Sequence, residues 1–345
     1  MVAIRRLVVS PPLINSSSPS ASEPNQLLEL FESPHTGAVT TRTATLTGFS
    51  ETSEHTVVFT NNSISSVNTY GYSPHPLSAY IGYVDAILSS APEHSIKPFI
   101  ISITSSSPIS LASMLDAIQE LRAKFHDTEG ATSRIGIELN TSCPNIKGSP
   151  PPAYNISGLV PILDALAECF WKDPTLTIGL KLPPYVYSTQ FDDLVGCIAT
   201  YSRPDPSDDS RRLNPFAFFT STNTLGQTLL FAEQAAPAPL SVVADSDGGA
   251  APAVFALPTG LGGMAGEALH PLALGNVYTL RRLLDAHTDT SLCDIWIVGV
   301  GGVTTREAHA RMRKAGAAVV ACATVLLREG VSVFEKLSIP SDGGD

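Results

Sequence analysis

Several residues of this 345-residue chain carry polar side chains that could bind a substrate or take part in its chemistry, and each ends or follows a short apolar run. Asn140 closes one run and is followed by Thr-Ser-Cys143-Pro, which places a thiol on the turn beyond it. An exposed loop cysteine can serve as a general base if its pKa falls below about 8.5. We therefore expect Cys143 to lie exposed on a loop and to take a proton from a substrate. An inert, buried thiol is the alternative for any cysteine, and we apply it to Cys169, Cys197, Cys293 and Cys322.

A lysine and a second asparagine occupy similar positions. Lys181 directly follows Ile-Gly-Leu, and Asn223 follows the run that ends at residue 220. A lysine at the end of an apolar run needs a partner or a bound anion, because burial penalises its charge. A polar residue also ends many strands that have no function, so these positions gain weight only if the fold brings them together.

A glycine-rich segment indicates a place for an anionic ligand. Gly299-Val-Gly301-Gly302-Val-Thr304 lies between an apolar run and a helix-period segment at 305–315. Glycines allow the backbone to approach a ligand closely, and the start of the following helix offers free N–H groups to a phosphate. Ala323-Thr324, after the last apolar run, would supply a second contact. A tight turn with no ligand is the alternative.

The elements that must position these residues alternate along the chain. Eight apolar runs predict strands, at 38–41, 65–68, 98–103, 135–140, 177–181, 216–220, 295–299 and 318–321. Most are continuous rather than alternating, as is typical of parallel strands covered on both faces. Helix-period segments lie at 76–89, 110–125, 158–171, 188–201, 271–286, 305–315 and 331–337.

This alternation predicts an α/β fold, a closed (β/α)8 TIM barrel with its active site at the C-terminal face of the strands. The alternative is an open doubly wound sheet, but no GxGxxG follows the first strand. We expect one domain over residues 1–345, with a surface loop inserted at 202–213. A second insertion at 234–265, rich in Ala, Pro and Gly, is expected on the C-terminal face as a functional or mobile loop.

Composition excludes several classes of protein. Lys plus Arg total 21 against 32 Asp plus Glu, a net charge of −11 that disfavours binding to nucleic acid or an anionic membrane. No apolar stretch reaches the roughly 18 residues of a membrane-spanning helix. The five cysteines are widely spaced with no CxxC, so we expect neither disulfides nor a metal site. Pro11 and Pro12 interrupt the short apolar run near the N-terminus, and we expect a cytoplasmic protein.

Over roughly residues 10–337 the chain resembles dihydroorotate dehydrogenases of the soluble, fumarate-dependent class 1A. The segments that carry the resemblance are NTSCPNIKGSP at 140–150, IGLKLPPY at 178–185, TSTNTLG at 220–226, GLGGMAGEALHPLALGNV at 260–277, IVGVGGVTT at 297–305 and ATVLLREG at 323–330. The resemblance implies an FMN-containing homodimer that oxidises dihydroorotate to orotate in de novo pyrimidine biosynthesis, with fumarate as electron acceptor.

The resemblance also implies roles for individual residues. Cys143 corresponds to the cysteine that takes the C5 proton while hydride moves from C6 to N5 of the flavin. Lys181 corresponds to the lysine near flavin N1 and the C2 carbonyl, where an ammonium stabilises the negative charge of the reduced ring. The residues expected to bind the substrate are Asn68, Asn140, Asn145, Asn223 and Thr224, the last in place of a family serine. The residues expected to bind the cofactor, besides Lys181, are Ser17, Ser18, Arg42, Gly301, Gly302, Ala323 and Thr324.

Three positions depart from the family pattern. Ser18 stands where the family has a glycine that lets the backbone approach the flavin, so we expect crowding. Arg42 replaces a family lysine, and this change is not conservative because a guanidinium is larger and planar. Ala323 replaces a glycine and keeps its N–H. These departures leave three alternatives: a flavoenzyme with another substrate or acceptor, a flavin-binding protein without turnover, and a barrel that binds no flavin.

Overall fold

The computed structural model describes residues 1–345 except 93–94, 147, 149, 207, 238–253 and 339–345. Its main sheet has eight strands in the described part of the chain, and every pairing between neighbours is parallel. The strands in spatial order are β3 (Leu13–Asn15), β16 (Val319–Cys322), β15 (Trp296–Val300), β12 (Phe216–Ser221), β9 (Ile178–Leu182), β8 (Ile135–Asn140), β7 (Phe99–Ile103) and β4 (Val39–Thr40).

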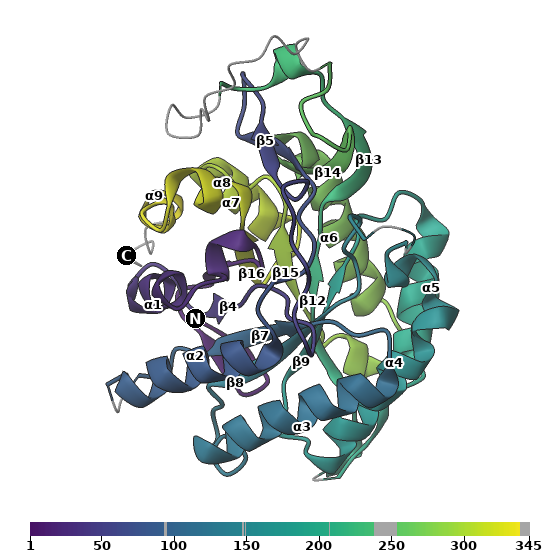
Figure 1. Ribbon diagram of the computed structural model, residues 1–345. Helices are drawn as coiled ribbons and strands as arrows, with labels where there is room; N and C mark the ends of the chain where they lie inside the picture. The colour runs from purple at the N-terminus through teal and green to yellow at the C-terminus, as the bar shows by residue number, and fades with distance from the viewer. Residues whose placement is uncertain (93–94, 147, 149, 207, 238–253, 339–345) are drawn as a thin grey trace, which may run out of the picture.

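Helices surround this sheet and complete the predicted (β/α)8 barrel, which is confirmed (Figure 1). They are α1 (Pro24–Glu32), α2 (Leu77–Ser90), α3 (Pro108–Lys124), α4 (Ile156–Lys172), α5 (Ser188–Ala199), α6 (His270–Asp285), α7 (Arg306–Lys314), α8 (Thr324–Glu329) and α9 (Val333–Leu337). Every residue of β7, β8 and β9 is buried, because one face of each strand packs on helices and the other fills the barrel.

A side chain joins the two strands at the ends of the main sheet. Asn15 on β3 is 0% exposed, and its Nδ2 donates to the Thr40 carbonyl on β4 at 2.6 Å. Its Oδ1 accepts from the Thr40 N–H at 2.9 Å. A carboxamide carries a donor and an acceptor like those of a peptide group. Asn15 therefore takes the place of a ladder residue where the barrel closes.

The sequence predicted the right number of barrel strands, but one of the eight predicted strands does not belong to the barrel. Residues 65–68 form β6 (Ser65–Asn68), which belongs to a second, antiparallel sheet and not to the barrel. The remaining barrel strand is β3, which we did not predict because it has three residues and runs directly into serines. Helices α1 and α8 were also not predicted.

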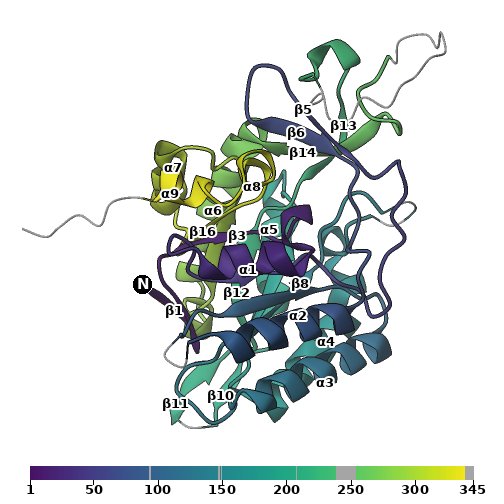
Figure 2. The same ribbon diagram turned by 60° about the vertical axis from the view of Figure 1, so that its left-hand side comes forward.

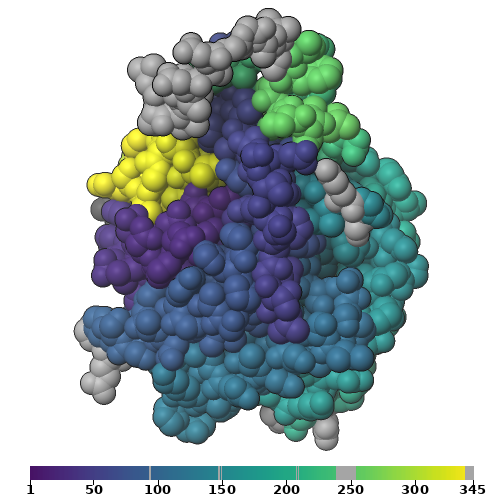
Figure 3. Space-filling model, in the orientation of Figure 1, coloured from purple at the N-terminus to yellow at the C-terminus, as the bar shows by residue number. Residues whose placement is uncertain are grey.

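The second sheet lies over the C-terminal ends of the barrel strands (Figure 2). Its order is β13 (Leu225–Leu229), β14 (Leu261–Gly266), β6 and β5 (Val57–Phe59). The predicted 234–265 insertion therefore contributes a strand at its end, and residues 238–253 of it lie outside the described residues. Figure 3 shows the segment between β4 and α2 running across the front of the molecule.

The 202–213 insertion is not an irregular loop. Its residues form an antiparallel hairpin of β10 (Arg203–Asp205) and β11 (Asp208–Leu213), at the end of the barrel opposite the second sheet (Figure 2). Arg212 Nη2 donates to the Ser202 carbonyl at 2.6 Å and Arg212 Nε to Asp289 at 3.1 Å. These tertiary contacts order a sequence whose composition alone is typical of a loop.

A hairpin at the N-terminus fills the end of the barrel that lies opposite the second sheet. It consists of β1 (Val2–Ile4) and β2 (Leu7–Val9), and Ile4, Leu7 and Val9 are completely buried. They pack in one cluster with barrel residues that include Phe218 and Ile100. No helix in the described part of the chain combines the length and apolarity that crossing a membrane requires.

Candidate functional site

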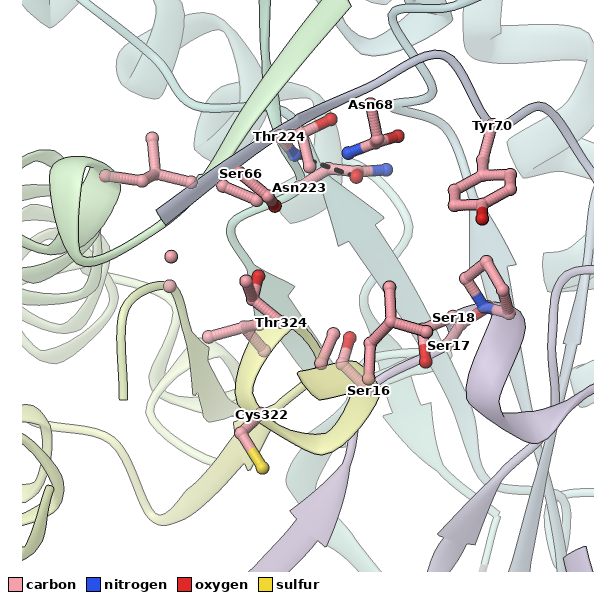
Figure 4. Close-up of a pocket in the computed structure, with 18 of the residues that line it drawn as sticks. Ser16, Ser17, Ser18, Ser66, Asn68, Tyr70, Asn223, Thr224, Cys322 and Thr324 are labelled. Atoms are coloured by element: carbon pink, nitrogen blue, oxygen red, sulfur yellow. Dashed lines mark hydrogen bonds between the residues drawn. The ribbon is translucent and has the colours of Figure 1, made fainter. Parts of the chain in front are cut away.

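A cavity at the C-terminal ends of the barrel strands brings together every residue predicted for the site. It encloses about 1030 Å³, counting space open to solvent, between the barrel and the second sheet. The predicted residues that line it are Ser17, Ser18, Arg42, Asn68, Asn140, Cys143, Asn145, Lys181, Asn223, Thr224, Gly301, Gly302, Ala323 and Thr324. Figure 4 shows the serines of residues 16–18 on one side of this space and Asn68, Asn223 and Thr224 on another.

Cys143 follows β8 but is not exposed as predicted. Its residue surface is 7% exposed, and Sγ donates to the carbonyl of Tyr70, 3.9 Å away. Burial raises the pKa of this thiol above its usual value, while a backbone hydrogen bond from Asn145 and then the charges of Lys181 and Arg42 act in the opposite direction. The expectation of a lowered pKa is therefore wrong for this structure, because the segment after β6 covers the turn.

The other cysteines differ from one another. Cys322 is buried at the end of β16 and lines the cavity, and burial raises its pKa to about 12. Cys169 and Cys197 are partly buried, while Cys293 is exposed. The prediction that all four are buried is wrong for Cys293, which lies in the connection between α6 and β15.

Lys181 is the penultimate residue of β9 and is 4% exposed. Its Nζ donates to Ser16 Oγ and to the Ser17 carbonyl, both at 3.2 Å. Burial lowers the pKa of Lys181, and the carboxylate of Glu138 is the main group that opposes this effect. The site thus contains an ammonium on the barrel floor whose nearest hydrogen-bond partners are neutral.

Glu138 lies below the cavity in the barrel interior and was not predicted. Its two carboxylate oxygens accept from Ser102 Oγ at 3.1 Å and Thr220 Oγ at 2.6 Å. Ser102 and Thr220 come from strands on either side of β8 and β9. Hydroxyl donors on two sides compensate for the burial of this carboxylate.

Two of the asparagines are joined through Ser142. Asn140 Nδ2 donates to Thr43 Oγ1 at 2.9 Å, and its Oδ1 accepts from the Ser142 backbone at 3.1 Å. Asn223 Nδ2 donates to Ser142 Oγ at 2.9 Å, and its Oδ1 accepts from the Thr224 N–H at 2.8 Å. The ends of β8 and β12 are thereby tied together at the cavity wall.

The other two asparagines meet beneath the second sheet. Asn145 Nδ2 donates to the Tyr70 carbonyl at 2.8 Å and to Asn68 Oδ1 at 3.2 Å. Asn68 Nδ2 donates to the carbonyl of Gly263 on β14 at 3.2 Å. These bonds connect the turn that carries Cys143 to the sheet above the barrel.

Arg42 follows β4 and makes an ion pair that sequence reasoning missed. Its two terminal nitrogens bond both carboxylate oxygens of Glu51, and Nη1 also donates to Ser22 Oγ at 3.3 Å. The guanidinium carbon lies 5.6 Å from the centre of the Tyr70 ring. A buried arginine needs an acidic partner, but nothing in the sequence identifies which carboxylate supplies it.

The turn after β15 requires its glycines. Gly301 and Gly302 have φ of 130° and 65°, and a Cβ on Gly302 would lie 2.6 Å from His270 Cβ. His270, another residue that we did not predict, bonds the Gly301 carbonyl through Nδ1 at 2.7 Å. Arg311 Nε donates to His270 Nε2 at 3.3 Å, so this ring joins the turn to α7.

Ser18 does not strain the backbone, although it replaces a glycine of the family pattern. Its φ of −163° and ψ of 168° are extended and open to any residue. Its Oγ is buried and has no hydrogen-bond partner among the described residues. A buried hydroxyl without a partner at a cavity wall is a donor available to a bound molecule. No cluster of three or more His, Cys, Asp or Glu suited to a metal ion occurs in the described ranges.

The chain has relatives that are consistent with this geometry. Residues 250–339 match the family model described as Dihydroorotate dehydrogenase. A probable dihydroorotate dehydrogenase A (fumarate) of Streptococcus pneumoniae serotype 4 is 28% identical over 275 residues, which is 80% of this chain and 71% of that protein. A putative dihydroorotate dehydrogenase A (fumarate) of Streptococcus equi subsp. equi is 26% identical over 326 residues, 94% of this chain and 86% of that protein.

Two crystal structures share the fold. The ligand-free DHODH of Eimeria tenella superposes with a TM-score of 0.68 at 14% identity, covering 97% of this chain and 84% of that one. The complex of DHODH from Eimeria tenella with ferulenol superposes with a TM-score of 0.64, also at 14% identity, covering 96% of this chain and 82% of that one.

Proposed function

We propose that this chain, whose resemblance to the dihydroorotate dehydrogenases is confirmed by these relatives, oxidises dihydroorotate to orotate with bound FMN and passes the electrons to fumarate. The observation that carries the proposal is the placement of Cys143 and Lys181 on one cavity. A cysteine that can accept a proton as its thiolate and a buried ammonium that favours negative charge are both needed when a C–H bond is broken at each of two neighbouring carbons.

The residues around the cavity fit FMN. The left-handed Gly301–Gly302 turn leaves room for a close backbone contact, and Ser18 Oγ offers an unused donor. Ala323 precedes α8 and has no side-chain cap, so backbone N–H groups at that end are open to a phosphate. Lys181 and the 16–18 segment would lie along the ring. When bound, FMN supplies a hydride acceptor that can later be reoxidised.

The chain's own groups provide the remaining chemistry. Asn68, Asn140, Asn145 and Asn223 offer amide donors and acceptors that match the imide edges of a uracil-like ring. Cys143, held beside Asn145, would take the C5 proton as a thiolate. Lys181 would stabilise the negative charge that the cofactor takes up with the hydride from C6, because an ammonium in a dry site interacts strongly with charge. The second sheet would exclude water.

Orotate formation tests this assignment. Without oxygen and without free FMN, the FMN-loaded protein should convert dihydroorotate to orotate repeatedly when fumarate is present and should stop without it once the bound flavin is reduced, as followed by chromatography of both pyrimidines. Lys181→Met should abolish conversion, whereas Lys124→Met, at an exposed position on α3, should not change it. Conversion at the wild-type rate by Lys181→Met would contradict the assigned role.

A second candidate function rests on Arg42. The guanidinium is engaged by Glu51, so the site could be adapted to another substrate on the same scaffold. In that case the protein would bind FMN but would not turn over dihydroorotate.

The assembly and location are also proposals. A homodimer would appear in sedimentation as twice the chain mass of 36.4 kDa. All five cysteines are free, which is compatible with the reducing cytoplasm.

A further inference from the structure

The ion pair between Arg42 and Glu51 places a carboxylate of the chain itself next to the proposed substrate site. Arg42 lines the cavity, and its side chain is 6% exposed. The partners that the Arg42 side chain hydrogen-bonds among the described residues, Glu51 and Ser22, do not line the cavity. Arg42 therefore contributes to the cavity wall while the charge of its guanidinium is neutralised by a carboxylate outside the lining.

The backbone on both sides of this pair is fixed. The Arg42 N–H donates to the Ala21 carbonyl at 2.9 Å. The segment that carries Glu51 is bonded through the Phe49 N–H to the Ser73 carbonyl at 2.8 Å. Phe49 also packs edge-on against Tyr72, with ring centres 5.9 Å apart. Glu51 itself is less confined, since its side chain is 27% exposed.

Arg42 also lies close to the groups proposed for chemistry. Its guanidinium carbon is 5.6 Å from the Tyr70 ring, and the Tyr70 carbonyl accepts from Cys143 and Asn145. The other cation of the cavity, Lys181, is bonded to the 16–18 segment and faces Glu138. Arg42 is thus the cation of the described cavity lining, besides Lys181, whose charge acts on the Cys143 thiol and that can meet an anionic group on a ligand next to it.

A guanidinium bound by both oxygens of one carboxylate attracts a second anion weakly. The two terminal nitrogens already donate to Glu51, and the opposite charges cancel at a distance. Dihydroorotate carries a carboxylate on its ring. To pair with Arg42 that group must share the guanidinium with Glu51 or displace Glu51, whose side chain is partly exposed to solvent.

We propose that Glu51 competes with the substrate's carboxylate for Arg42 and so sets the affinity of the cavity for anionic ligands. This inference rests on the proposed function. It makes Glu51 a specificity-determining residue that does not touch the reacting carbons. The proposal also gives a reason for an arginine at this position. The five N–H donors of arginine can bond first the carboxylate of Glu51 and then that of the substrate, whereas the charge of a lysine is concentrated at one ammonium.

The test is the binding of two ligands that share a pyrimidine ring and of which only one carries a carboxylate. In Glu51→Gln, loaded with FMN, the dissociation constant of orotate should fall by about tenfold at low ionic strength, which corresponds to ~1.4 kcal/mol. That of uracil, which has the ring but no carboxylate, should change by less than about twofold. The affinities are measured by isothermal titration calorimetry, and salt should reduce the orotate effect because Glu51 is partly exposed.

The matched control is Glu32→Gln on α1. It removes the same single negative charge at an exposed position outside the cavity lining. It should leave both dissociation constants unchanged. An equal gain in orotate affinity from Glu32→Gln would mean that net charge alone is responsible, and the inference would fail.

Other outcomes separate this inference from the proposed function. Unchanged or weaker orotate binding by Glu51→Gln would overturn the inference, as would equal effects on orotate and uracil or a failure of either protein to bind orotate. Dihydroorotate oxidation by the wild type is measured separately. If the wild type oxidises dihydroorotate but Glu51→Gln does not bind orotate more tightly, only the inference is contradicted. If Glu51→Gln binds orotate more tightly but the wild type does not oxidise dihydroorotate, only the proposed function is contradicted.

Discussion

Burial acts in opposite directions on the two titratable groups that the proposed reaction needs. It raises the pKa of Cys143 and lowers that of Lys181, so each group alone is driven toward its neutral form. Their mutual attraction favours the charged forms, because a thiolate and an ammonium stabilise each other. The cavity therefore couples proton acceptance by Cys143 to the charge of Lys181.

The raised pKa of Cys143 predicts a specific pH dependence. The thiolate fraction grows about tenfold per pH unit below the pKa and is constant above it. The rate of flavin reduction by dihydroorotate should therefore rise with pH through neutrality and level off only on the alkaline side of the usual cysteine value. Anaerobic stopped-flow measurements across this range check it. A rate that is flat or falls as pH rises would contradict Cys143 as the base.

Replacement of the same residue gives a second prediction. Cys143→Ser should retain FMN, but the rate of flavin reduction should fall by ~10²-fold or more, since a hydroxyl is a much poorer base near neutral pH. Single-turnover reduction is measured under anaerobic conditions. Cys293→Ser, at the exposed cysteine, should behave as the wild type. A near-normal rate in Cys143→Ser would rule out the assigned role.

Sequence reasoning located the residues of the site but not their partners. Strand ends in a barrel converge, so the sequence alone was enough to place Asn140, Lys181 and Asn223 together. Glu51 and His270 were missed because each acts through a contact with a segment far away in the chain. The burial of Cys143 was missed because the covering segment follows a strand of the second sheet.

At the scale of elements, the junction between β3 and β4 depends on one side chain. Asn15→Leu keeps the approximate volume but leaves the Thr40 N–H and carbonyl without their partner. Each buried unpaired group costs about 1–3 kcal/mol, so we expect the two groups to lower the free energy of unfolding by ~2–6 kcal/mol. Urea denaturation measures this loss. Asn25→Leu, at an exposed position on α1, is the control; equal midpoints for the two variants would argue against closure by Asn15.

The errors among the elements have a common physical origin. Residues 65–68 have the composition of a barrel strand but pair with β14 and β5, and pairing partners are set by tertiary structure. The three-residue β3 is too short for periodicity to reveal it. In the 202–213 hairpin, contacts of Arg212 override a composition typical of loops. Long helices such as α3 and α4 were predicted within two residues at each end.

At the scale of the whole molecule, the barrel and the second sheet together enclose one cavity, and we propose that residues 1–345 form a single domain around it. FMN bound there should stabilise the folded chain by mass action. At about 100 times its dissociation constant, FMN should add ~2.7 kcal/mol and raise the melting temperature by several degrees. Riboflavin, which lacks the phosphate, should give a smaller shift at the same concentration. Equal shifts would contradict a phosphate site at Gly301 and Gly302.

The central claim is tested most directly by the visible spectrum of the FMN-loaded protein during a single cycle. Dihydroorotate is added without oxygen, and fumarate is added afterwards. We predict that the flavin band bleaches on the first addition and recovers on the second, which would establish the cofactor, the substrate and the acceptor together. A yellow protein that dihydroorotate never bleaches would contradict the proposed function.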